Sequence, residues 1–250
     1  MKKTLLVAML TLASTAAMAQ VNIQAHYDFG RKAYPDAEAT RQNMTVTFEQ
    51  FRPDRLGNIF YFIDLDLYSK GMKGAYIEFS REFNIGKKGF AIHGEYNGGM
   101  TTGKNAIYAS QFQHAFLLGP AYNRHNSDYS FTWSVQALYK QYFKGVDGAD
   151  AFPSIQLTGV WGWTFGNEGM FTFSGYIDFW RKPKPTTGSY SITMQTEPQL
   201  WFNLNSVTKK KTNLSIGTEW ELSNNFIFPE GGSTKTFFFN PTLALKWTMK

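Results

Sequence analysis

The stretch that decides the fold is NIFYFIDLDLY, residues 58–68. Its aliphatic and tyrosine side chains occupy every second position and alternate with a set in which two phenylalanines precede two aspartates. Side chains of a β-strand point alternately to opposite faces of the sheet. The stretch therefore predicts a strand with one apolar face and one face that combines aromatic rings with carboxylates.

The same alternation recurs along the chain and predicts twelve strands of about ten to eleven residues. The predicted strands are residues 21–29, 44–51, 58–68, 75–85, 90–97, 106–118, 129–140, 155–164, 171–179, 192–202, 213–222 and 237–247. The alternation leaves the two faces of 106–118 unassigned. Tight connections at 53–57, 86–88 and 166–169 contrast with longer ones, such as 31–43, 143–152 and 223–235.

Short turns at one end and long loops at the other are typical of a transmembrane β-barrel. A soluble sandwich or barrel also alternates, but its apolar face points inward and rarely carries so many large aromatics. This chain has 23 Phe, 13 Tyr and 7 Trp among its 250 residues. We therefore predict an all-β fold, a transmembrane antiparallel β-barrel of about 12 strands with both termini periplasmic.

Composition excludes several other classes of protein. The absence of cysteine removes disulfides, thiolate metal sites, a cysteine nucleophile and a lipidated cysteine. Beyond residue 20 no run of about 20 apolar residues could form a membrane helix, and a disordered chain would be poor in aromatics.

The first residues have the order of a secretory signal. Two lysines precede an apolar stretch, and Ala17-Met18-Ala19 provides small residues at a cleavage position. We expect residues 1–19 to be a signal peptide that is removed near Ala19, and residues 20–250 to form an outer-membrane barrel.

Charge divides between the two faces of the predicted strands. The apolar face carries only Arg81 and Arg181, both near strand ends, as a lipid-facing surface requires. The opposite face would line the lumen. It carries eleven acidic residues and few basic ones, mainly Lys140 and Lys246. These acids are Asp28, Glu49, Asp64, Asp66, Glu78, Glu82, Glu95, Asp178, Glu197, Glu219 and Glu221.

The net charge of +6 consequently comes mostly from the connections. A nucleic-acid partner would need a basic stripe on one structured face, so none is expected. Paired acids on one strand, such as Glu219 with Glu221 or Glu78 with Glu82, could each form half of an ion-pair ladder.

Phe60, Phe62, Asp64 and Asp66 lie on the lumenal face of one strand. Aromatic rings beside carboxylates suit a ligand with a flat ring and several hydroxyls. The alternative interpretation is that a narrow twelve-stranded barrel fills part of its bore with whatever side chains pack there.

Residues 44–64, MTVTFEQFRPDRLGNIFYFID, resemble the second and third strands of the nucleoside-specific channel (Tsx) family. That family shows an aromatic-acid-aromatic strand, a short basic turn and a strand of the form F-x-F-x-x-x-D. Residues 76–85, 175–178 and 196–200 are similar to later strands of the family.

The resemblance implies a monomeric twelve-stranded barrel with a narrow pore that passes nucleosides, and pore-lining roles for Phe60, Phe62, Asp64, Glu78 and Glu82. Together with the division of charge, it gives the expected substrate-binding and pore-lining set. That set is Phe60, Phe62, Asp64, Asp66, Glu78, Glu82, Asp178, Glu197 and Glu219.

An enzymatic role is less favoured, although outer-membrane phospholipases and lipid A deacylases also have twelve strands. Such an enzyme needs a Ser–His–Asn or similar set within hydrogen-bonding reach. Adjacent residues such as His125-Asn126-Ser127 cannot form a triad with one another, and no H-E-x-x-H, G-x-S-x-G or P-loop motif is present. His26 and His93 lie on polar faces near acids, where hydrogen bonding explains them as well as metal binding does.

We therefore expect no catalytic residue, metal or cofactor. The predicted function is passive diffusion of small polar solutes, nucleosides foremost, across the outer-membrane bilayer. A structural or adhesive barrel and a barrel lipid hydrolase remain the alternatives.

Overall fold

The computed structural model describes residues 20–69, 71–102, 109–145, 148–183, 189–208 and 211–249, and the predicted signal peptide lies outside this part of the chain. The strands are β1 Gln20–Asp28, β2 Met44–Asp54, β3 Gly57–Tyr68, β4 Gly71–Ile85, β5 Phe90–Thr102, β6 Ala109–His125, β7 Phe131–Tyr142, β8 Phe152–Phe165, β9 Phe171–Pro183, β10 Tyr190–Thr196, β11 Gln199–Asn203, β12 Leu214–Asn224 and β13 Phe237–Met249. The short helical segments are α2 Gly30–Ala33, η1 Asn167–Gly169 and η2 Leu204–Ser206. Within the described residues, no helix has the length and apolar character needed to cross a membrane.

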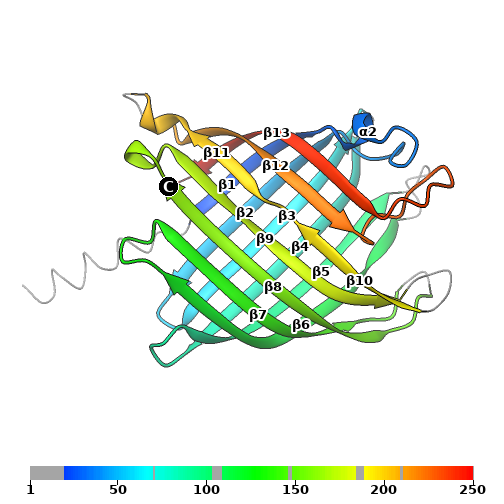
Figure 1. Ribbon diagram of the computed structural model, residues 1–250, viewed down its shortest axis with the longest axis horizontal. Coiled ribbons are helices and arrows are strands. Elements are labelled where there is room, and N and C mark those ends of the chain that lie inside the picture. Colours follow the sequence, from blue (N-terminus) through cyan, green and yellow to red (C-terminus); the bar gives the residue numbers. More distant parts are fainter. Residues whose placement is uncertain are drawn as a thin grey trace, which may run out of the picture.

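The strands form one closed antiparallel barrel (Figure 1). Pairing of β1 with β13, from Val21 opposite Met249 to Asp28 opposite Thr242, closes the ring. β10 and β11 both pair with β9 and β12, so they are two parts of one barrel strand. Pro198 lies between these parts and has no N–H to donate to the ladder. The ring therefore has twelve strands, which confirms the predicted antiparallel β-barrel of about 12 strands.

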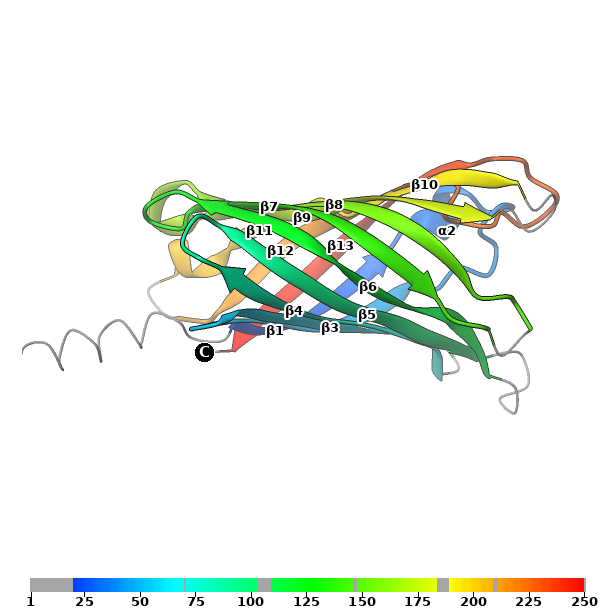
Figure 2. The same cartoon turned by 90° about the horizontal axis from the view of Figure 1, so that it is seen from below.

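An even number of strands brings both termini to one end of the barrel, which we call the terminus end. Its connections are 55–56, 86–89, 126–130, 166–170 and 204–213. The opposite, loop end includes the connections 29–43, 143–151 and 225–236. The barrel is flattened, with β7, β8 and β9 in one wall and β1, β3 and β4 in the other (Figures 1 and 2).

Tight turns at the terminus end depend on glycine. In the β4–β5 connection, Gly86 and Gly89 have φ of +67° and +84°, a region that side chains with a Cβ disfavour. A Cβ on Gly89 would also lie 2.2 Å from the carbonyl oxygen of Asn123. The turn thus requires glycine for its backbone conformation and for close contact with β6.

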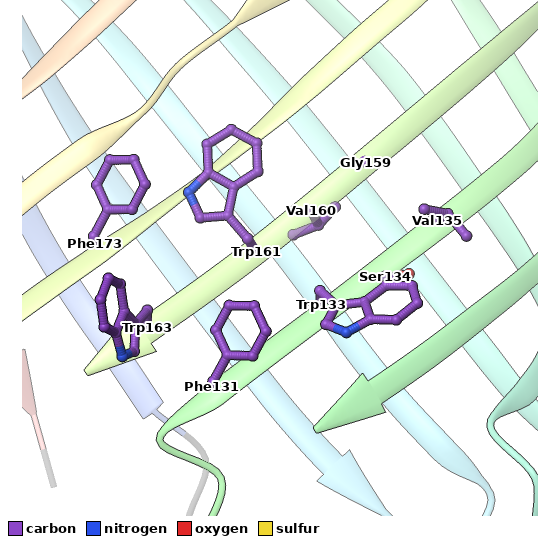
Figure 3. A pocket seen from close by; sticks show the side chains of 9 residues that line it. All are labelled: Phe131, Trp133, Ser134, Val135, Gly159, Val160, Trp161, Trp163 and Phe173. Carbon is purple, nitrogen blue, oxygen red and sulfur yellow. The ribbon is translucent and has the colours of Figure 1, made fainter. Parts of the chain in front are cut away.

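The outer face of the barrel is apolar, as the alternation predicts. Exposed side chains on it include Leu118, Ile155 and Leu243, and β6 turns Phe116 and Leu118 outward while Leu117 and Ala121 are buried. On β7–β9 a groove is lined by nine residues, all but Ser134 of them apolar (Figure 3). They are Phe131, Trp133, Ser134, Val135, Gly159, Val160, Trp161, Trp163 and Phe173. An apolar band with aromatic side chains toward its edges is typical of a lipid-facing barrel surface.

The two arginines predicted on the outer face both have local partners. Arg81 forms an ion pair with Asp54 at 2.7 Å and lies over the ring of Phe83. Arg181, near the loop end, stacks on Tyr190 at 3.6 Å from the ring centroid. Both charges therefore sit at the ends of strands, where a lipid-facing charge costs least.

Candidate functional site

The lumen collects the acidic residues that the strand alternation assigns to the inner face. Of the nine residues predicted to line the pore, eight are half-buried, and Glu82 is buried at 3% exposure. Half-buried carboxylates on an inner wall remain within reach of water. The lumen is thus a polar interior in which most of the predicted side chains present an accessible surface.

A row of aromatic rings crosses the wall formed by β3 and β4. The ring centroids of Phe60 and Phe62 are 6.0 Å apart, and Phe62 is 6.0 Å from Tyr76 on β4. Asp64 and Asp66 continue the same face of β3. The structure therefore brings the predicted Phe60, Phe62, Asp64 and Asp66 together on one wall.

Neutral side chains on neighbouring strands orient the acids. Thr47 and Thr45 of β2 donate to Asp64 at 2.5 Å and to Asp66 at 2.9 Å. The other bonds of this kind run from Tyr76 to Glu78 at 2.8 Å, Thr158 to Asp178 at 2.5 Å, Gln195 to Glu197 at 2.9 Å and Gln199 to Glu219 at 2.5 Å. These carboxylates are held in place by neutral hydroxyl and amide donors.

Acids from opposite walls face one another across the flattened lumen. Asp64 of β3 interacts electrostatically with Glu197 and Glu219 of the opposite wall. Glu78 of β4 interacts in the same way with Asp178 of β9. The structure thus groups these predicted acids into two sets that face one another across the lumen.

The two predicted lumenal lysines lie against aromatic side chains. Lys140 donates to Gln156 at 2.8 Å and its ammonium lies 4.9 Å from the ring centroid of Trp180. The ammonium of Lys246 lies 4.0 Å from the ring centroid of Trp201. Cation–π contact stabilises both lysines at the wall, and two positive charges are few against eleven acids.

At the terminus end of the lumen, Glu82, His93 and Glu95 form what we call the His93 cluster. The Nδ1 and Nε2 atoms of His93 lie 3.1 Å and 2.9 Å from carboxylate oxygens of Glu82 and Glu95. Glu82 also accepts hydrogen bonds from the side-chain amides of Asn58, Asn123 and Gln136. A ring that faces a carboxylate on both sides fits the doubly protonated, positively charged imidazole.

Hydrogen bonds to Glu82 and Glu95 thus account for the position of the His93 ring. Among the described residues there is no group of three or more His, Asp or Glu side chains arranged to hold a metal ion. The sequence placed Glu82 and His93 on lumenal faces, but their contact depends on the β4–β5 register, which pairs the two residues directly.

At the loop end, Asp28, Glu38, Arg41 and Glu221 form what we call the Arg41 cluster. Arg41 lies in the connection 29–43 and points into the lumen, where its guanidinium is 2.7 Å from Asp28, 3.0 Å from Glu38 and 2.9 Å from Glu221. Sequence reasoning missed Glu38 and Arg41 because a connection has no strand alternation that assigns its side chains to a face.

Electrostatics at this cluster follow from burial and charge. Burial raises the pKa of the Glu38 carboxyl above its usual value, although the nearby charge of Arg41 opposes the shift. Burial alone would lower the pKa of Arg41, but the charges of Glu221 and Asp28 and a hydrogen bond to Asp28 raise it. Arg41 therefore stays charged, whereas Glu38 carries the least favourable negative charge of the cluster.

Comparison with known proteins gives a family and a fold. A family model described as a domain of unknown function, DUF5020, matches residues 19–249, so the chain belongs to this family. No curated protein matches the sequence.

Among solved structures, the NanC porin matches with a TM-score of 0.55 and 7% identity over 92% of this chain and 100% of that chain. The KdgM porin matches with a TM-score of 0.47 and 9% identity over 92% of this chain and 99% of that one. The outer-membrane channel DcaP of Acinetobacter baumannii matches with a TM-score of 0.38 and 8% identity over 92% and 96%. At 7% identity the likeness to the NanC porin establishes the barrel fold alone.

Proposed function

We propose that this member of the DUF5020 family is an outer-membrane channel through which small polar solutes diffuse passively. The observation that carries the proposal is the division of the barrel into an apolar exterior and a half-buried acidic interior. The porin-like fold supports it. In this proposal residues 1–19 are the secretory signal, the barrel is a monomer and both termini are periplasmic.

The charge of the lumen favours cations over anions. Eleven wall carboxylates outnumber the cationic side chains described above, which are Lys140, Lys246, His93 and Arg41, and both lysines lie against aromatic rings. Rings of acidic side chains select cations in channels. Reconstitution in planar bilayers under a salt gradient tests the proposal, with a cation-selective reversal potential as the expected result. A barrel without conductance would refute the channel, and anion preference would refute the assigned charge of the lumen.

Nucleosides are the solute class that the β3 wall suits best. Phe60 and Phe62, with Tyr76 beside them, offer rings to a planar base, and Asp64 and Asp66 can accept hydrogen bonds from ribose hydroxyls. The resemblance of residues 44–64 to nucleoside-specific channels supports the same solute. We expect added nucleoside to reduce the ion current of the wild-type channel while it occupies this wall.

Two substitutions on β3 test the nucleoside site. Because a base stack or a charge-assisted hydrogen bond contributes about 1–3 kcal/mol, Phe62→Ala or Asp64→Asn should weaken the nucleoside block about tenfold. Tyr61→Ala is the matched control, because Tyr61 lies on the outer face of the same strand. Equal block in all three variants would refute the site. Wild type without any block would leave a general small-solute channel.

A further inference from the structure

The Arg41 cluster lies at the loop end of the lumen, where three strands and one connection converge. Asp28 is the last residue of β1, Glu221 lies near the end of β12, and Asn240 lies on β13. Glu38 and Arg41 come from the connection 29–43. This end of the lumen therefore contains a cationic side chain that does not belong to the barrel wall.

All five N–H groups of the Arg41 guanidinium have carboxylate acceptors. Nε and Nη2 donate to Asp28 at 3.0 and 2.7 Å, and Nη1 donates to Glu38 at 3.0 Å. Nη1 and Nη2 also reach the two oxygens of Glu221 at 3.5 and 2.9 Å. The paired contact with Glu221 is the fork-to-fork geometry by which carboxylates recognise guanidinium groups.

Other contacts hold the connection over this end. Tyr34 packs edge-on against Phe238 at 5.1 Å between ring centroids, and its hydroxyl accepts the backbone N–H of Phe239. The backbone N–H of Glu230 donates to the carbonyl of Ala37, which ties 29–43 to the β12–β13 connection. Arg41 thus reaches the lumen from a connection that is held by side-chain and turn contacts and is not paired as a strand of the barrel wall.

The cluster has more acceptors than Arg41 satisfies. Three carboxylates face one guanidinium, and Asp66 is close enough to interact with both Arg41 and Glu221. In the described part of the chain, Glu38 Oε2 and Asn240 Oδ1 have no hydrogen-bond donor, at exposures of 3% and 0%. Buried acceptors without donors are rare in native proteins. Lys73, from β4, bonds to the Thr40 carbonyl.

We propose that Asp28, Glu38, Glu221 and Asn240 form a recognition site for organic cations, that Arg41 occupies this site at rest, and that solutes bearing a guanidinium group pass by replacing Arg41. The inference rests on the proposed channel function and names its solute class at this end. A guanidinium group is favoured because the acceptors already match its five donors. The unused acceptors of Glu38 and Asn240 become available to the entering cation once Arg41 has left the cluster.

Methylguanidinium is the probe, and its binding is measured by calorimetry on the folded barrel in detergent. Arg41→Ala should bind methylguanidinium at least tenfold more tightly than wild type, since the acceptors no longer hold a tethered guanidinium. Adding Glu221→Gln to Arg41→Ala should reverse most of this gain. Arg31→Ala, an exposed arginine of the same connection, should behave as wild type.

Arg41→Lys is a second variant, in case the connection 29–43 does not dock without a positive charge at residue 41. Lysine keeps the charge but cannot make the paired contacts, so methylguanidinium should bind this variant more tightly than wild type and less tightly than Arg41→Ala. Arg41→Ala and Arg41→Lys variants that both bind like wild type would overturn the proposal.

Conductance separates this inference from the proposed function. Methylguanidinium added at the loop end should block the Arg41→Ala channel at a concentration at least tenfold lower than it blocks wild type. Binding in detergent by a barrel that conducts no ions would refute the channel and leave the recognition site standing. A cation-selective channel whose Arg41→Ala variant binds no methylguanidinium would refute the site alone.

Discussion

Each end of the lumen holds a cationic side chain among carboxylates, but a strand carries it at one end and a connection carries it at the other. At the terminus end, His93 lies between Glu82 and Glu95, and at the loop end, Arg41 lies among Asp28, Glu38 and Glu221. Each end thus places one nitrogen-rich side chain among carboxylates that would otherwise repel one another.

The difference is in what carries the positive charge. His93 is on β5, and the backbone pairing of β5 with β4 and β6 fixes its position. Arg41 is on a connection, so it can leave its carboxylates without breaking any strand pairing. If Arg41 is displaced as proposed above, similar ionic contacts are structural at one end of the barrel and exchangeable at the other.

The largest expected effect is on the His93 cluster. His93→Ala would leave Glu82 and Glu95 without their shared partner inside the wall, and removal of one member of a buried ionic pair typically costs about 3–5 kcal/mol. We expect the free energy of unfolding in urea and lipid vesicles to fall by about 3 kcal/mol, because the three amide donors to Glu82 remain.

His125→Ala is the matched control for this measurement. His125 is exposed at the β6–β7 turn, where it stacks on Tyr129, and its removal should change the free energy of unfolding by less than about 0.5 kcal/mol. Equal stability of the two variants would show that the His93 cluster contributes nothing to the wall.

Arg41→Ala should have a smaller effect on the barrel and a local effect on the connection. The freed carboxylates can take up water in the space that the guanidinium leaves, so the free energy of unfolding should fall by only about 1 kcal/mol. Trypsin should cleave after Arg31 or Lys32 about tenfold faster than in wild type. This factor corresponds to a decrease of about 1.4 kcal/mol in the free energy of local opening of the connection.

Arg55→Ala, in the β2–β3 turn at the other end, should leave both measurements unchanged. If Arg41→Ala destabilised the whole barrel as much as His93→Ala, the two ends would be equivalent and the comparison would fail.

The sequence predicted the barrel well because strand alternation is a local signal. The faces of β3 follow from residues 58–68 alone, and the structure places Phe60, Phe62, Asp64 and Asp66 on one wall as predicted. The division of charge was predictable for the same reason, since a carboxylate on the lipid-facing side would be costly.

What the sequence could not predict depends on register and on connections. Glu82 meets His93 because β4 and β5 pair in one particular register, and a shift by one residue would turn His93 to the other face. Arg41 and Glu38 lie in a segment without periodicity, so only the fold shows that they reach the lumen. The sequence offers one signal, Asp28 followed by an acid and an arginine in the same long connection, and this pattern is too common to assign a site.

The smallest expected effect is the pH dependence of loop docking through Glu38. Burial raises the pKa of Glu38, so the docked connection binds a proton more tightly than the free one. The stabilising contribution is therefore complete below the usual pKa of 4.5 and is lost as the pH rises through the raised value. The groups that face Glu38 are Arg41 and Glu221, together with Asn240.

Glu38→Gln imitates the protonated carboxyl at every pH and should remove this dependence. At pH 8, hydrogen exchange of the amides in residues 31–41 should be a few-fold slower in Glu38→Gln than in wild type. Near pH 5 the two proteins should exchange at similar rates. The ratio of the two rates is taken at each pH, so that the intrinsic exchange rates cancel. Glu168→Gln, at the terminus end, should match wild type throughout. Slower exchange in wild type than in Glu38→Gln at pH 8 would mean that the attraction between Glu38 and Arg41 outweighs the burial of the carboxylate. In that case ionised Glu38 would stabilise the docked connection 29–43. Arg41 would then be held in its cluster as a structural charge, as His93 is at the other end.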